Sequence, residues 1–189
     1  MRYRSLTLAL VLCSNGVWSQ EVPQVSLAGV QTPWNVRTII DKLIDDNERF
    51  EPILDAIHPR DWVVKGASSV YIQQLQQAQQ QTRDVVNTSK LLAQKTDQLS
   101  LALDEYFRLE ALDSTARSLE EGVLRYADRS SADKLAALIA HNFSAREQFR
   151  DYLSSLATSQ EKNFKVADQE AQRCRGIISR EPVPPKTKK

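Results

Sequence analysis

The sequence is poor in residues that interrupt helices and in residues that build common catalytic and metal sites. Its 189 residues include only 5 Gly, 7 Pro, 2 Cys and 2 His. Two cysteines exclude a disulfide scaffold, and five glycines exclude a collagen-like chain and leave few for phosphate-binding loops. Beyond residue 20, no apolar run approaches the roughly 18 residues that a membrane-spanning helix needs. The scarcity of turn-forming residues predicts long helices.

An excess of charge of one sign is also lacking. The chain has 25 Lys and Arg against 24 Asp and Glu, so its formal net charge is +1. This balance provides no basic surface for nucleic acid and no strong attraction to an anionic membrane. We therefore expect neither as a partner. The hydrophobic fraction of 41% is close to that of globular proteins and argues against a chain disordered throughout.

The amino terminus has the pattern of a secretory signal peptide. Arg2 and Arg4 precede a short apolar stretch over residues 6–12. We predict a signal peptide over residues 1–19 with cleavage after Ser19, cleavage after Gly16 being the alternative, and hence export to a periplasmic or extracellular location.

A lipid anchor at Cys13 would follow only if the signal were of the lipoprotein type. That type needs a small residue directly before the cysteine, where this chain has Leu12. An ordinary cleaved signal is therefore favoured.

Composition divides the remaining chain into three parts. Residues 20–33 contain two prolines and one acidic residue and are predicted to form an extended leader. Residues 179–189 form a tail rich in Pro and Lys. The helical domain is predicted over residues 34–178. Its first helix would run from Trp34 to Ile57, with a kink or a restart at Pro52.

The strongest helical pattern runs from Ala67 to about Leu112, where neither Gly nor Pro occurs. Its apolar and small residues recur alternately at four and three positions, which is the seam of a coiled coil. We predict one continuous helix here, roughly 65–70 Å long. The seam residues are Tyr71, Leu75, Ala78, Thr82, Val85, Ser89, Leu92, Thr96, Leu99, Leu103 and Tyr106.

Shorter helices are expected after this rod. One would start at Asp113 or Ser114 and end near Asp128, and a short one would be capped by Ser130 and Ser131. Ser144 and Glu147 form a capping box that predicts a fresh start and a last helix reaching Arg175. A single helix over residues 131–175 is the alternative. The expected fold is an all-α, elongated antiparallel helical bundle, a coiled-coil hairpin with a small helical head. The head would hold aromatic rings from Tyr106, Phe107, Tyr126, Phe143, Phe149 and Tyr152.

Residues suited to catalysis or metal binding are few. Asp55 and His58 have the spacing of two ligands on one helix face, but the pair occurs once and is followed by Pro59, so a histidine at a helix end is favoured. His141 falls at a predicted turn. We predict no catalytic residue, no metal ligand and no cofactor.

Cys174 is the only cysteine that would remain after cleavage. It cannot form a disulfide within the chain, and a buried, inert thiol is favoured. The alternatives are an intermolecular disulfide or a reactive thiol, because Arg173 and Arg175 flank the cysteine and would stabilise its thiolate.

Two stretches resemble segments of a family of uncharacterised exported helical proteins of soil bacteria. They are LDEYFRL at residues 103–109 and FKVADQEAQRCRG at residues 164–176, and the resemblance spans about residues 100–178. It implies a bacterial envelope or secreted location and brings no activity, cofactor or site residue.

These observations favour an exported, non-enzymatic helical scaffold or protein-interaction module that binds a protein partner or a second copy of itself. The reason is that the predicted long helix pair has an incomplete seam. An incomplete seam often indicates that a further helix, from a second copy or from a partner, packs against it. The alternative is a small-ligand or cofactor-binding bundle with a pocket among the head aromatics.

Overall fold

Six α-helices make up the part of the chain that the computed structural model describes, residues 33–179. No strand occurs within these residues, which confirms the all-α prediction. The predicted signal peptide with Ser19 and Cys13, most of the leader and most of the tail lie outside the described residues. The helices are α1 (Pro33–Glu48), α2 (Phe50–Asp55), α3 (Pro59–Val64), α4 (Val70–Leu92), α5 (Leu99–Tyr126) and α6 (Arg129–Ile178).

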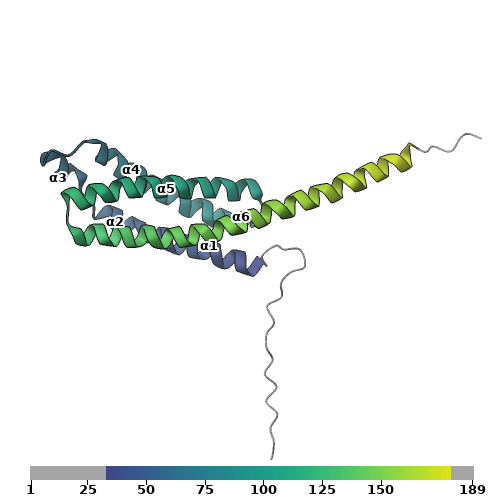
Figure 1. Ribbon diagram of the computed structural model, residues 1–189, viewed down its shortest axis with the longest axis horizontal. Helices are drawn as coiled ribbons and strands as arrows, with labels where there is room; N and C mark the ends of the chain where they lie inside the picture. The colour runs from purple at the N-terminus through teal and green to yellow at the C-terminus, as the bar shows by residue number, and fades with distance from the viewer. Residues whose placement is uncertain (1–32, 180–189) are drawn as a thin grey trace, which may run out of the picture.

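The long helices form an antiparallel four-helix bundle (Figure 1). α1 and α5 run in one direction and α4 and α6 in the other. Each packs against two neighbours, α1 and α5 both contacting α4 and α6. α2 continues the direction of α1, and α3 turns the chain into α4. This up-down-up-down order follows from short connections between consecutive helices.

The prediction of one helix from Ala67 to Leu112 was wrong. The chain turns back at residues 93–98, and α4 and α5 pack against each other as an antiparallel hairpin. A single long rod would leave its apolar seam in water, whereas the turn buries the two halves against each other and against α1 and α6. The turn needs neither Gly nor Pro, because Lys95 N–H donates to Leu92 O and Gln98 N–H donates to Lys95 O.

The seam changes register at this turn. In α4 the buried positions are those that the sequence predicted, from Ala78 to Leu92. In α5 the buried residues are instead Ala102, Glu105, Leu109, Leu112, Ala116, Leu119, Gly122 and Val123. Leu103, a predicted seam residue, is 38% exposed. The predicted helix start at Asp113 or Ser114 was also wrong, because α5 is continuous there.

α6 is one helix, so the predicted break before Ser144 was wrong and the alternative was correct. The buried seam passes through the expected break, with Leu138, Asn142, Ala145 and Phe149 in steps of four, three and four. Burial along this seam outweighs the local capping pattern. Asp128, not Ser130 or Ser131, caps the helix by accepting a hydrogen bond from Ser131 N–H at 2.8 Å.

Proline and glycine have their expected effects at the other end of the bundle. The first predicted helix restarts after Arg49, and Pro52 lies in the first turn of α2. Pro59 occupies the first position of α3. Gly66 has a φ of +93°, a left-handed conformation that L side chains rarely adopt, and it lets the chain leave α3 for α4.

The apolar core consists of two clusters along the bundle. The first contains Phe149 and Tyr152 with Val85, Leu92 and Leu109. The second surrounds Trp62 at the α3 end. The six aromatic residues predicted for a head do not gather in one place. Tyr106, Phe149 and Tyr152 belong to the first cluster, Tyr126 packs against the second, and Phe107 and Phe143 are exposed.

Candidate functional site

Two features stand apart from the apolar core: a layer of polar side chains, of which Asp46, Asn47, Asn142 and Arg146 are buried, and a long segment of α6 that projects beyond the bundle. The polar layer comprises Asp46, Asn47, Glu110, Asp113, His141, Asn142 and Arg146. Each feature is a candidate for function, because polar groups in a core and apolar groups in water both cost free energy.

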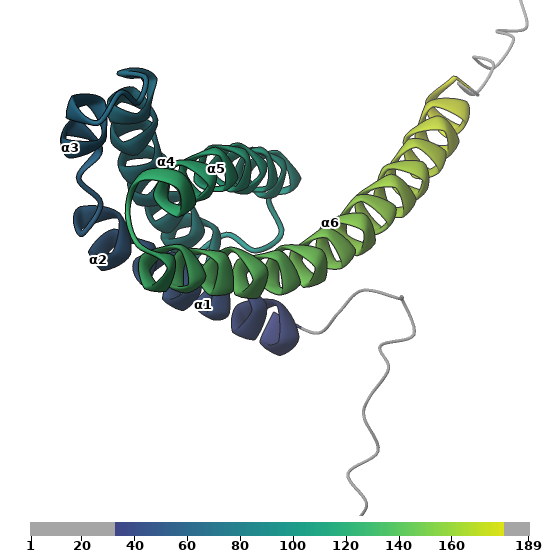
Figure 2. The ribbon, with the colours of Figure 1, turned by 60° about the vertical axis from the view of Figure 1, so that its left-hand side comes forward.

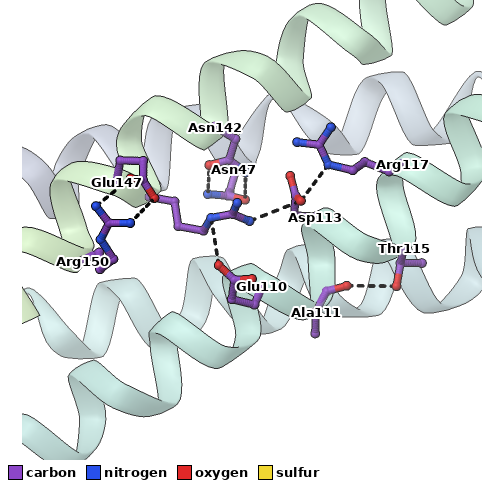
Figure 3. Close-up of polar contacts among 10 residues, drawn as sticks. Asn47, Glu110, Ala111, Asp113, Thr115, Arg117, Asn142, Glu147 and Arg150 are labelled. Carbon is purple, nitrogen blue, oxygen red and sulfur yellow. Dashed lines mark hydrogen bonds and ion pairs between the residues drawn. The ribbon is translucent and has the colours of Figure 1, made fainter.

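The two amides at the centre of the polar layer satisfy each other. Asn142 Nδ2 donates to Asn47 Oδ1 at 2.9 Å, and Asn47 Nδ2 donates back to Asn142 Oδ1 at 3.3 Å (Figure 3). Asn47 is fully buried and also donates to Leu43 O at 2.7 Å. This reciprocal pair joins α1 to α6. Both hydrogen bonds form in only one register of the two helices, so the pair favours that register over the adjacent ones.

A buried arginine joins α6 to α5. Arg146 Nε lies 3.1 Å from Glu110 Oε1, and its Nη1 lies 3.4 Å from Asp113 Oδ2. Asp113 is shared with Arg117, whose Nε lies 2.8 Å from the same oxygen. The guanidinium also lies over the Phe143 ring, 5.3 Å from its centroid. The two carboxylates compensate the positive charge of the guanidinium, so the cluster holds α5 and α6 together.

Asp46 and His141 form a third contact between α1 and α6. His141 Nε2 lies 3.0 Å from Asp46 Oδ1. The aspartate is buried, and its Oδ2 has no hydrogen-bond partner among the described residues, while the imidazole is half exposed. His141 thus lies within a helix and not at the predicted turn.

Glu105 is the most perturbed acid among the described residues. It is fully buried between α4 and α5, and its Oε1 accepts a hydrogen bond from Ser89 Oγ at 2.5 Å. Burial raises the pKa of Glu105 to about 8, because the hydrogen bond from Ser89 and the charge of Arg108 offset only part of the desolvation. The carboxyl group is therefore mainly protonated at neutral pH.

Asp55 and His58, the two residues with the spacing of a ligand pair, contact different parts of the bundle. Asp55 Oδ1 accepts from Gln79 Nε2 at 2.9 Å, which ties α2 to α4. His58 precedes α3 and lines a groove of about 370 Å³ that Asp61 and Gln76 also line. Within residues 33–179, no group of three or more His, Cys, Asp or Glu side chains is close enough to hold a metal ion.

The projecting segment of α6 begins where its neighbours end. Tyr152 OH donates to Thr96 O, and Gln160 Nε2 donates to Asp97 O at 3.2 Å, so the α4–α5 turn closes the bundle at this level. Every residue from 160 to 179 is exposed. We call residues 161–178 the overhang. It continues α6 without a break for about 27 Å into solvent (Figures 1 and 2).

The overhang carries an apolar stripe. Phe164 is 73% exposed and Ile178 is 74% exposed. Between them lie Ala167, Ala171 and Cys174, all exposed, so that the five residues follow one another in steps of three, four, three and four. We call these five residues the stripe. The spacing places them along one side of the helix, as in a coiled-coil seam.

Cys174 is an exposed free thiol. The favoured prediction of a buried, inert cysteine was wrong, because the bundle ends well before this residue. An intermolecular disulfide and a reactive thiol stay predictions.

None of the helices in the described part of the chain is long and apolar enough to span a membrane. Comparison with known proteins gave no match: no protein-family model, no curated protein and no solved structure is significantly similar to this chain.

Proposed function

We propose that this chain is an exported, non-enzymatic protein-interaction module that binds its partner through the overhang of α6. The observation that carries the proposal is the exposed apolar stripe on the overhang, a segment of α6 that no other helix among residues 33–179 covers. The expectation of a long polar-seamed rod no longer supports an interaction role, because α4 and α5 fold back on each other.

The energetics of an isolated helix favour a partner. A helical segment of about 18 residues is only marginally stable in water on its own. Two large apolar side chains, Phe164 and Ile178, gain nothing from the bundle while they remain exposed. Amphipathic helices of this kind are recognised by docking their apolar face against another protein. Binding would remove the stripe from water and would stabilise the helix of the overhang.

The polar layer fits the same interpretation. Its amides and its guanidinium are paired across helix interfaces, which suits a rigid support for the overhang. The head aromatics do not favour the ligand-pocket alternative, since they divide between two clusters and the surface.

A pair of matched variants tests the proposal. Phe164→Glu with Ile178→Glu places two negative charges on the stripe, and Gln169→Glu with Gln172→Glu places the same charge on the opposite side of the overhang. We expect crosslinking in the native envelope fraction to capture the same protein with the wild type and with the Gln variant. The stripe variant should lose it.

Circular dichroism should show equal helix content and melting temperature in the three proteins, because none of the four positions contacts the bundle. Equal capture by the three proteins, or capture by none of them, would refute the proposal.

A further inference from the structure

We infer that the partner of the overhang is the overhang of a second copy, paired with it in the antiparallel direction. This inference rests on the proposed function and names the partner. It is argued from the place of the stripe on α6, from the order of large and small residues along it, from the charges beside it and from the position of the bundle.

The stripe lies on the side of α6 that faces the bundle. The buried seam of α6 ends at Leu156, and two steps of four residues lead through Gln160 to Phe164. Eight residues make about 2.2 turns, so Phe164 is displaced by about a fifth of a turn from Leu156. The overhang thus presents much the same side that α1 and α5 cover in the first half of α6, but without these two neighbours.

The stripe is complementary to itself when it is reversed. Antiparallel pairing centred between Ala167 and Ala171 sets Phe164 opposite the small Cys174 of the second copy. It also sets Ala167 opposite Ala171 of the second copy, so each bulky ring meets a small side chain. Large residues that face small ones fill a helix interface without voids or clashes.

Charges beside the stripe also match at both ends of the pair. Glu161 and Arg175 lie at equivalent flanking positions, two heptads apart. In the antiparallel arrangement, Glu161 of each copy lies opposite Arg175 of the other, which gives two attractive pairs. Near the two-fold axis, Asp168 lies opposite Asp168 of the second copy, and Glu170 lies opposite Glu170 of the second copy. Glu170 Oε1 also lies 3.8 Å from Arg173 of the same helix. These repulsions weaken the pairing and make the dimer reversible.

The position of the bundle excludes parallel pairing. Figure 2 shows α6 curving toward the side on which α4 and α5 lie, with α1 packed along its other side. Two overhangs that ran in the same direction with their stripes in contact would bring both bundles to the same end and to the same side, where they would overlap. Antiparallel pairing places the two bundles at opposite ends of the shared segment. Each overhang tip then lies beside the α4–α5 turn of the other copy.

Light scattering on a size-exclusion column tests the association with the full chain. We expect a dimer whose fraction rises with protein concentration. Phe164→Glu with Ile178→Glu should weaken the dimer at least about tenfold, and the Gln169→Glu, Gln172→Glu control should leave it unchanged. Asp168→Asn removes the central repulsion and should tighten the dimer by about two- to fivefold. A tighter dimer of the expected mass, with an unchanged circular dichroism spectrum, distinguishes this effect from the aggregation of a misfolded variant.

Disulfide trapping tests the direction. Phe164→Cys should form a covalent dimer with the native Cys174 under mild oxidation, whereas the same variant with Cys174→Ser should not. The wild type should not crosslink through Cys174, because in the antiparallel pair the two sulfurs lie about 15 Å apart along the axis. A wild-type dimer joined through Cys174 would overturn the inference by showing parallel pairing.

A wild type that remains a monomer at high concentration would also overturn the inference. If that monomer still captured another protein through the stripe, the proposed function would survive and only the second copy would be excluded as the partner.

Discussion

The stability of the bundle should fall as the pH rises through the pKa of Glu105. The carboxyl group has an ordinary pKa of 4.5 in the unfolded chain and a pKa of about 8 in the folded one. The folded protein therefore holds this proton more tightly than the unfolded chain. The resulting stability is fully present below pH 4.5 and is lost as the pH rises through 8.

The magnitude follows from the same two values. Each unit of pKa difference is worth about 1.4 kcal/mol, so the whole effect is about 5 kcal/mol, of which about 4 kcal/mol falls between pH 5 and pH 9. This is a large share of the 5–15 kcal/mol that is typical of a folded domain. Glu105→Gln keeps the size of the side chain and removes the titration. We therefore expect the variant to lose much less free energy of unfolding than the wild type over this pH range.

Urea unfolding followed by circular dichroism at pH 5, 7 and 9 measures the effect. Asp104→Asn is the matched control, since it makes the same chemical change at the neighbouring, half-exposed carboxylate. Because the charge of Asp104 makes the smallest of the contributions to the raised pKa of Glu105, this variant should keep most of the pH dependence of the wild type. The two histidines are present in all three proteins and cancel from the comparison. Parallel curves for the wild type and Glu105→Gln would refute the argument that burial of this carboxyl group controls the stability.

Three further substitutions test the packing of the bundle, each by its effect on the free energy of unfolding in urea. Gly122→Ala should destabilise the fold by about 1–3 kcal/mol despite the better helix propensity of alanine, because the new Cβ would lie 2.5 Å from Tyr71 Cε1. Adding Tyr71→Leu should relieve part of this loss. A Gly122→Ala variant as stable as the wild type would contradict the clash. Asn142→Leu should cost about 1–3 kcal/mol because it leaves the buried Asn47 Oδ1 without its hydrogen-bond donor. Replacing both amides by Leu should cost less than this, and additive losses would show that the pair is not coupled. Arg146→Met should cost about 1–3 kcal/mol, because Glu110 loses its ion pair while Asp113 keeps Arg117 as a partner. An unchanged free energy of unfolding would show that the guanidinium does not hold the two helices together.

The helical periodicity predicted much of the fold. In α4, the spacing of Ala78, Thr82, Val85, Ser89 and Leu92 identified the face that is buried. It could not locate the turn at residues 93–98, because a three-and-four pattern can be traced across that turn through Thr96 and Leu99. The usable signal was a second, better repeat that begins at Ala102 and has a different register. A change of register within an apparently unbroken helix can mark a turn that contains no Gly or Pro.

The polar layer was missed because single buried polar residues look like exposed ones in a sequence. Glu105 and Asn142 occupy seam positions of otherwise apolar repeats, and that position was the available sign of their burial. Arg146 and its partners come from different helices, so only the packing brings them together. The end of the bundle could also have been predicted, because the next positions on the buried side of α6 after Leu156 are Ser159, Gln160 and Asn163, which are poor core residues.

The continuity of α6 has a mechanical consequence. One uninterrupted helix belongs both to the four-helix packing and to the free arm, so the arm cannot swivel about a joint as a loop-tethered peptide would. A partner bound to this arm is held in an orientation that the four-helix bundle fixes, apart from the bending that a helix allows. Inserting a flexible spacer after Gln160 would keep every contact surface intact. It would abolish only the fixed orientation of the bound partner relative to the bundle.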